Sequence, residues 1–113
     1  MKALAAALML SLLAGAAQAA GPGDNARATM ARAGCGACHV IPGVTGASGL
    51  AGPPLNGVGR RVYLAGVLPN TPANMALWIS RPQSVRKGDA MPDQKRMTPD
   101  QAAVIAAYLE TLR

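Results

Sequence analysis

The amino-acid sequence predicts an all-α fold in which a few helices are joined by long loops. The same helix-start signal, a threonine followed by a proline, occurs at Thr71-Pro72 and at Thr98-Pro99. After each signal, apolar residues recur at the spacing of one helix face. No segment has the alternating apolar and polar residues that are typical of a half-buried strand, and no internal repeat is present.

The beginning of the chain predicts an export signal. A lysine at position 2, an apolar run over residues 3–16 and an Ala-x-Ala site at 17–19 are typical of a cleaved secretory segment. The run is shorter than the ~20 apolar residues that span a bilayer. We therefore expect a signal peptide over residues 1–19 and one soluble periplasmic domain over residues 20–113, without a transmembrane segment.

Composition limits both the core and the partners. Aromatic residues make up 3% of the chain and phenylalanine is absent, so side chains alone fill little core volume. The formal net charge of +6 is compatible with a nucleic-acid partner, but predicted export and scarce aromatic residues argue against one. We expect a monomer. Its expected partner is an acidic protein or an anionic membrane surface.

The first helix is expected over residues 24–33, with Asp24 as its N-cap. Ala26, Met30 and Ala33 form its narrow apolar stripe. This stripe ends two residues before Cys35, the first residue of the segment with the candidate functional side chains.

That segment is Cys35-Gly36-Ala37-Cys38-His39, and the Cys-x-x-Cys-His spacing attaches a c-type haem. Two thiols at this separation form thioethers with the two porphyrin vinyl groups, and His39 then ligates the iron. A closed zinc site needs four ligands, whereas the chain has two cysteines and one histidine. A redox dithiol needs no following histidine and usually lies in a βαβ pattern. We expect one covalently attached haem c.

A glycine-rich loop is expected over residues 43–59, because four glycine triplets are too few for collagen. Within it, Gly52-Pro53-Pro54-Leu55 makes the backbone rigid. A metal-bound histidine normally donates its other N–H to a carbonyl or carboxylate. A proline carbonyl of this segment suits that role.

Two further helices complete the expected fold. The first follows Thr71, runs through Arg81 and is stopped by Pro82. The second has a capping box at Thr98 and Gln101. Their apolar faces consist of Met75, Trp78 and Ile79 in the one helix and of Val104, Ile105, Tyr108, Leu109 and Leu112 in the other.

A methionine is the expected second axial ligand, because His39 is the single histidine and a thioether is the usual alternative. Met91 lies in a loop before Pro92, which removes a backbone donor and restricts the chain. The signal segment, helix faces and a hydrophobic-staple position explain the others, which are Met1, Met9, Met30, Met75 and Met97.

The order and spacing of these motifs resemble a class I cytochrome c, and particularly the haem c domain fused to some bacterial cytochrome oxidase subunits II. The motifs are Cys35-x-x-Cys38-His39, Gly52-Pro53-x-Leu55, Asn70-Thr71-Pro72, Trp78-Ile79, Pro82, Ala90-Met91-Pro92 and Ala107-Tyr108-Leu109. The resemblance covers the whole of residues 20–113. It implies a small cytochrome c fold with three main helices and long loops around one covalent haem, the first and last helices crossing.

The resemblance also implies residue roles. His39 and Met91 would lie on opposite faces of the iron, with the Pro53 carbonyl accepting from His39. Arg61 would lie near a haem propionate and Trp78 beside the distal face. Met30 and Ala26 stand where the family has an aromatic residue and a glycine, so we expect a looser or differently packed helix crossing. The chain lacks the transmembrane hairpin and copper domain of the oxidase subunit, and we expect a free-standing version.

The expected function is one-electron transfer between a respiratory donor and a terminal oxidase or reductase, without catalysis. One alternative is a haem subunit permanently docked in a dehydrogenase or oxidase complex. Another is a haem enzyme or gas sensor with a displaceable distal ligand. Five cations flank Met91 in the sequence and favour an acidic redox partner: Arg81, Arg86, Lys87, Lys95 and Arg96.

Overall fold

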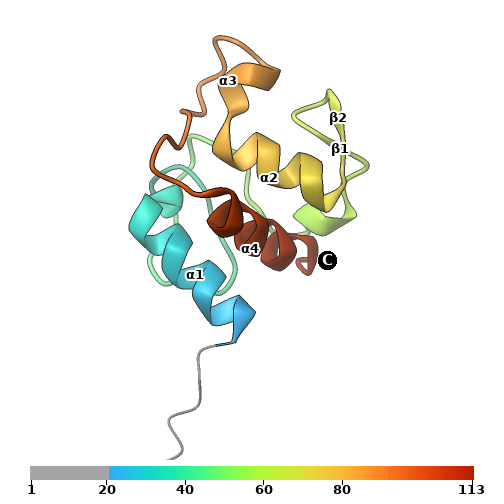
Figure 1. Cartoon of the computed structure of the whole chain (residues 1–113). Helices are drawn as coiled ribbons and strands as arrows, with labels where there is room; N and C mark the ends of the chain where they lie inside the picture. Colours follow the sequence, from blue (N-terminus) through green and yellow to red (C-terminus); the bar gives the residue numbers. More distant parts are fainter. Residues whose placement is uncertain (1–20) are drawn as a thin grey trace, which may run out of the picture.

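The computed structural model describes residues 21–113, and they form a mainly helical domain (Figure 1), which confirms the expected all-α fold. The predicted signal peptide over residues 1–19 lies outside the described residues. The helices are α1 (Pro22–Ala33), α2 (Pro72–Ser80), the short α3 (Pro82–Val85) and α4 (Pro99–Glu110). The central helix is α4, because it packs against both α1 and α2.

The core lies where these three longer helices meet. Ala26 and Met30 of α1 are 0% and 1% exposed, so the residues that depart from the family pattern fill this helix crossing. Ile105 and Leu109 of α4 are buried with them. The cluster also contains Ile41, Val58, Leu64, Met75, Ile79 and Ala106. Burial of apolar side chains from all three helices holds them together.

The first helix begins earlier than the sequence pattern predicts. Pro22 is its first residue and Gly21 its N-cap. Asp24, the predicted cap, instead lies in the first turn and accepts a hydrogen bond from Gly21 N at 3.2 Å. The reason is that proline, with its fixed φ and missing N–H, suits the first helical position. The C-terminal end at Ala33 is as predicted, and Gly34 terminates the helix at φ 76°.

The two threonine caps are confirmed. Thr71 accepts from Asn74 N at 3.1 Å, and Thr98 and Gln101 form the predicted capping box of α4. The helix after Thr71 ends at Ser80 rather than Arg81, and Pro82 does more than stop it. Pro82 opens α3 as that helix's first residue, a position where its missing N–H costs nothing.

A short antiparallel hairpin was not predicted. Strands β1 (Tyr63–Leu64) and β2 (Leu68–Pro69) pair with Leu64 opposite Leu68. Strands of two residues are too short to display an alternating pattern, so they cannot be recognised from the sequence. The turn between them places Ala65 at φ 51° and Gly66 at φ 72°, the left-handed geometry of a hairpin turn.

Tyr108 ties three distant segments together. Its hydroxyl donates a hydrogen bond of 2.5 Å to Pro42 O, immediately before the glycine-rich loop. The guanidinium of Arg27, in α1, lies 5.3 Å from the centre of the tyrosine ring, within the range of a cation–π interaction. The loop, α1 and α4 are therefore fixed to one another. None of the helices within residues 21–113 is both long and apolar enough to cross a membrane.

Candidate functional site

The Cys35–His39 segment forms a tight turn directly after α1. It contains the 3-10 turn η1 (Cys35–Ala37), and the backbone N–H groups of Cys38 and His39 both bond to Cys35 O, at 3.2 and 3.1 Å. Both cysteines are free thiols. Cys38 is exposed, whereas burial raises the pKa of the Cys35 thiol. The turn thus presents two free thiols and an imidazole from five consecutive residues.

The glycine-rich loop lies directly against this turn. Gly52 N donates to Cys38 O at 2.7 Å. A Cβ added at Gly52 would be 2.4 Å from His39 Cε1, and one added at Gly49 would be 2.2 Å from Ala37 O. Because no side chain fits at such distances, both positions require glycine. Gly52 allows the loop to lie against the imidazole ring, and Gly49 allows it to lie against the backbone of the turn.

The contact that orients His39 is with Pro53. His39 Nδ1 lies 2.7 Å from Pro53 O. Since a carbonyl oxygen only accepts hydrogen bonds, Nδ1 must carry the proton. The lone pair of the neutral ring is then on Nε2. This is the tautomer in which Nε2 is the metal-ligating atom.

Arg61 is anchored to the same loop. Its Nη2 donates to Pro54 O at 2.8 Å, and its own carbonyl accepts from Asn70 Nδ2 at 2.8 Å. Asn70 Nδ2 also donates to Val58 O at 3.1 Å, just where the 3-10 turn η2 (Val58–Arg60) begins. Asn70 Oδ1 is buried without a partner within the described chain. Asn70 therefore fixes the backbone around Arg61. The sequence places Asn70 in a motif but assigns it no role.

Met91 lies in the loop after α3, and both of its backbone polar groups are bonded. Met91 N donates to Asp89 Oδ1 at 2.9 Å, and Met91 O accepts from Gln83 Nε2 at 2.9 Å. An aspartate bonding two residues ahead is a local turn that the Asp-x-Met sequence would have suggested. The Gln83 contact crosses eight residues and has no local sequence signal.

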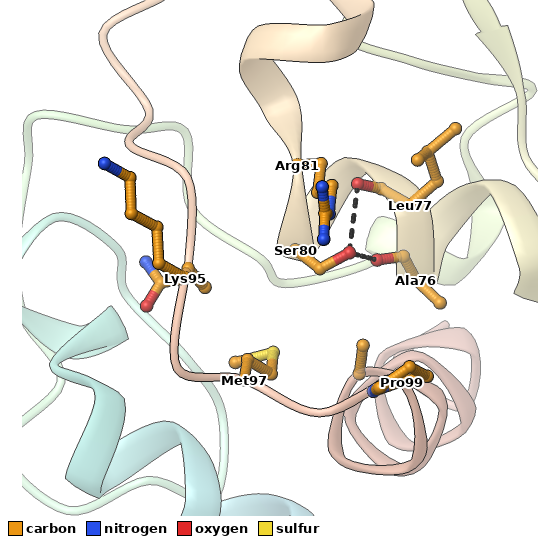
Figure 2. Close-up of a pocket in the computed structure, with 9 residues that line it drawn as sticks. Ala76, Leu77, Ser80, Arg81, Lys95, Met97 and Pro99 are labelled. Atoms are coloured by element: carbon orange, nitrogen blue, oxygen red, sulfur yellow. Dashed lines mark hydrogen bonds between the residues drawn. The ribbon is translucent and has the colours of Figure 1, made fainter.

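Trp78 and Met97 are half-buried and pack against the core. Figure 2 shows Met97 beside a groove of about 240 Å³ between α2, α4 and the segment before α4. Its other lining residues are Ala76, Leu77, Ser80, Arg81, Gln94, Lys95, Pro99 and Ala102. A second groove of about 450 Å³ is also lined by Met97. Neither groove is lined by His39 or Met91, the two expected iron ligands.

The comparison with known families decides the classification of this chain. The sequence model described as Cytochrome c matches residues 24–113. The chain belongs to the cytochrome c family. Membership implies a covalently bound haem c, and the observed groups fit it: two free thiols one turn apart, and an imidazole whose Nδ1–H bond to Pro53 O leaves Nε2 as the free ring nitrogen.

This cytochrome c is also similar to cytochrome c oxidase subunit 2 of Alkalihalophilus pseudofirmus. The two are 37% identical over 79 residues. The matched part is 70% of this chain, and the chain spans 22% of the relative's length. No solved structure matches the chain.

Proposed function

We propose that this cytochrome c holds its haem through thioethers at Cys35 and Cys38 and ligates the iron with His39 Nε2 and Met91 Sδ. The hydrogen bond between His39 Nδ1 and Pro53 O carries this assignment, because it leaves Nε2 free to ligate. The glycine at position 52, which allows the loop to lie on the imidazole ring, supports it. Two free cysteines on one turn supply the attachment points.

Met91 is the better thioether candidate than Met97. The backbone of Met91 is held by two hydrogen bonds to side chains, an arrangement that fixes where its side chain begins. Met97 packs against the core immediately before the cap of α4. Packing therefore explains Met97.

Arg61 and Trp78 are proposed to contact the bound haem. Arg61 Nη2 is occupied by Pro54 O, but a guanidinium has five N–H donors. The remaining donors are available for a propionate, which arginine binds well. Trp78 is half-buried on α2 and packs against the core, so it is suited to form an apolar wall beside the distal face.

The proposed function is that of a periplasmic one-electron carrier. Held by His39 and Met91, a haem would supply one-electron exchange at its iron without a substrate having to bind there. Pro53, Gly52 and the bonded Met91 backbone hold both ligands in one arrangement, which keeps the reorganisation on electron transfer small. The electron would come from a quinol-oxidising complex or a periplasmic dehydrogenase and pass to a terminal oxidase or reductase.

We infer an acidic redox partner from the charges near the Met91 loop. Lys87, Lys95 and Arg96 are exposed, and no hydrogen bond or ion pair holds their side chains within residues 21–113. Arg86 is different, because it donates to Ala65 O at 2.9 Å and lies 3.9 Å from Asp89. The three free cations would accelerate encounter with an acidic surface, mainly at low salt.

A haem subunit docked permanently in an oxidase is the second candidate, favoured by the similarity to an oxidase subunit 2. Such a subunit would copurify with a partner in fixed stoichiometry, and the complex would remain intact at high salt. A carrier that purifies alone and reacts at a salt-dependent rate would contradict it.

Mass spectrometry and one redox titration test the proposed function. A preparation from a strain with cytochrome c maturation should show the chain from Ala20 plus one haem, lost when Cys35 and Cys38 are both replaced by alanine. The titration should fit one electron, with a far-red charge-transfer band in the oxidised protein. An apoprotein mass would refute attachment, and rapid carbon monoxide binding by the reduced wild type would favour an enzyme or sensor.

A further inference from the structure

The loop that carries Met91 has little regular structure of its own. It runs from the end of α3 at Val85 to Pro92, and its backbone bonds include Arg86 N to Pro82 O and Asp89 N to Arg86 O. The other polar groups of a loop must find side-chain partners or water. In this loop two side chains supply them, and one of these comes from outside the loop.

That outside residue is Gln83, the second residue of α3. Its Nε2 donates to Asp89 O at 2.7 Å and to Met91 O at 2.9 Å, and its Oε1 accepts from Gly88 N at 2.9 Å. The orientation of the amide is fixed by these partners, because two carbonyls only accept and an N–H only donates. One half-buried side chain thus makes three bonds to the loop.

Gln83 is itself held in place. It follows Pro82, which is fully buried at the start of α3. Its backbone N donates to Asp93 Oδ1 at 3.0 Å. The residues on both sides of Met91 in the sequence, Asp89 and Asp93, are therefore each bonded to Gln83.

We propose that Gln83 is the positioning residue for Met91, a role that rests on the proposed ligation of iron by the Met91 thioether. Gln83 fixes Met91 O and Asp89 O, while Asp89 Oδ1 fixes Met91 N. Both the N–H and the carbonyl of Met91 are held, so the Cα from which the proposed ligand side chain extends has one fixed position. A thioether is a neutral ligand that loop motion can withdraw, and Gln83 opposes that motion.

The test replaces Gln83 in the haem-loaded protein and measures the Met91 bond directly. Gln83→Leu removes all three hydrogen bonds at similar volume. Gln83→Glu keeps the acceptor for Gly88 N but places a second oxygen against the two carbonyls, and it serves if the leucine variant does not fold. Gln101→Leu is the matched control, because its side chain caps α4 by accepting from Thr98 N at 2.9 Å.

The far-red band of the oxidised protein should disappear at lower urea concentration in either Gln83 variant than in the Gln101 control. Carbon monoxide should bind the reduced Gln83 variants at least roughly tenfold faster, which corresponds to about 1.4 kcal/mol in favour of the open site. A Gln83→Leu or Gln83→Glu protein that matches the Gln101 control in both measurements would overturn the role of Gln83. A wild type without the far-red band would overturn the Met91 assignment and the role of Gln83 together.

Discussion

Tyr108 and Pro42 are 66 residues apart in the sequence, and the tyrosine hydroxyl donates a 2.5 Å hydrogen bond to the proline carbonyl. The proline belongs to the segment between the Cys35–His39 turn and the glycines that cover it. Through this bond α4 holds the glycine-rich loop against the haem-attachment turn. A turn near the beginning of the described chain is thereby supported by a helix near its end.

We predict that Tyr108→Phe lowers the free energy of unfolding by about 1 kcal/mol, the usual net contribution of one hydrogen bond. Urea unfolding of the haem-loaded protein measures this. Tyr63→Phe is the control, because Tyr63 is 58% exposed and should unfold like the wild type. Equal stability of the two variants would show that the Pro42 bond contributes nothing.

Gly52→Ala should disturb the ligand side of the haem. Its methyl group would meet the His39 ring at 2.4 Å, so either the ring or the loop must move, and the bond to Pro53 O weakens. We expect reduced haem incorporation or an altered absorption spectrum in the purified protein.

The control is Gly46→Ala in the same loop. Nothing lies within 4 Å of an added Cβ there, but φ is 75°, so the cost is about 1–2 kcal/mol of backbone strain. The control should lose stability and keep the wild-type spectrum. Identical spectra for both variants would mean that Gly52 does not constrain His39.

Replacing Met91 should change the iron environment, whereas replacing Met97 should change only stability. Met91→Ala removes the proposed thioether ligand, so the far-red band should vanish and the reduction potential should fall, because methionine ligation raises it. Met97→Ala removes a packed, half-buried side chain and should keep the band. Loss of the band in the Met97 variant alone would reassign the ligand.

Charge reversal at Lys87 and Lys95 should slow electron transfer to the true acceptor at low ionic strength. Both lysines are exposed, and surface charge acts chiefly on the rate of encounter. Stopped-flow rates of the Lys87→Glu, Lys95→Glu double variant measure the effect.

Salt provides the internal control for that experiment. The difference from the wild type should shrink as salt is added, because the Debye length falls from about 10 Å at 0.1 M to about 3 Å at 1 M. Arg86 is left unchanged, since its bond to Ala65 O and its proximity to Asp89 shape the Met91 loop. Rates that respond to neither change would place the interface elsewhere.

Local chemistry made the starts of α2 and α4 and the Cys-x-x-Cys-His motif predictable. A threonine cap followed by proline involves four consecutive residues, and the Cys-x-x-Cys-His motif involves five. Both can therefore be recognised from the sequence. The missed features are those set by contacts across the fold. Pro82 opens α3 rather than merely ending α2, and Gln83 has hydrogen-bond partners up to ten residues away.

The same distinction applies to glycine. The sequence shows that the loop over residues 43–59 is rich in glycine, but not which glycines are needed for space. Gly52 is required because His39 lies against it, whereas Gly46 has open space around it and is needed for its φ of 75°. Only the folded chain separates the two reasons.

The packing of α1 against α4 constrains the order of events during biosynthesis. Of the described elements, α4 leaves the ribosome last, and Ala26 and Met30 have no partner helix until it does. A chain in which α4 has not yet packed therefore lacks the α1–α4 contact that lies next to the Cys35–His39 turn in the sequence. If haem is joined to the two thiols as proposed, an exported chain without the α1–α4 contact would be the open form that receives it, and the packing of α4 would then complete the core.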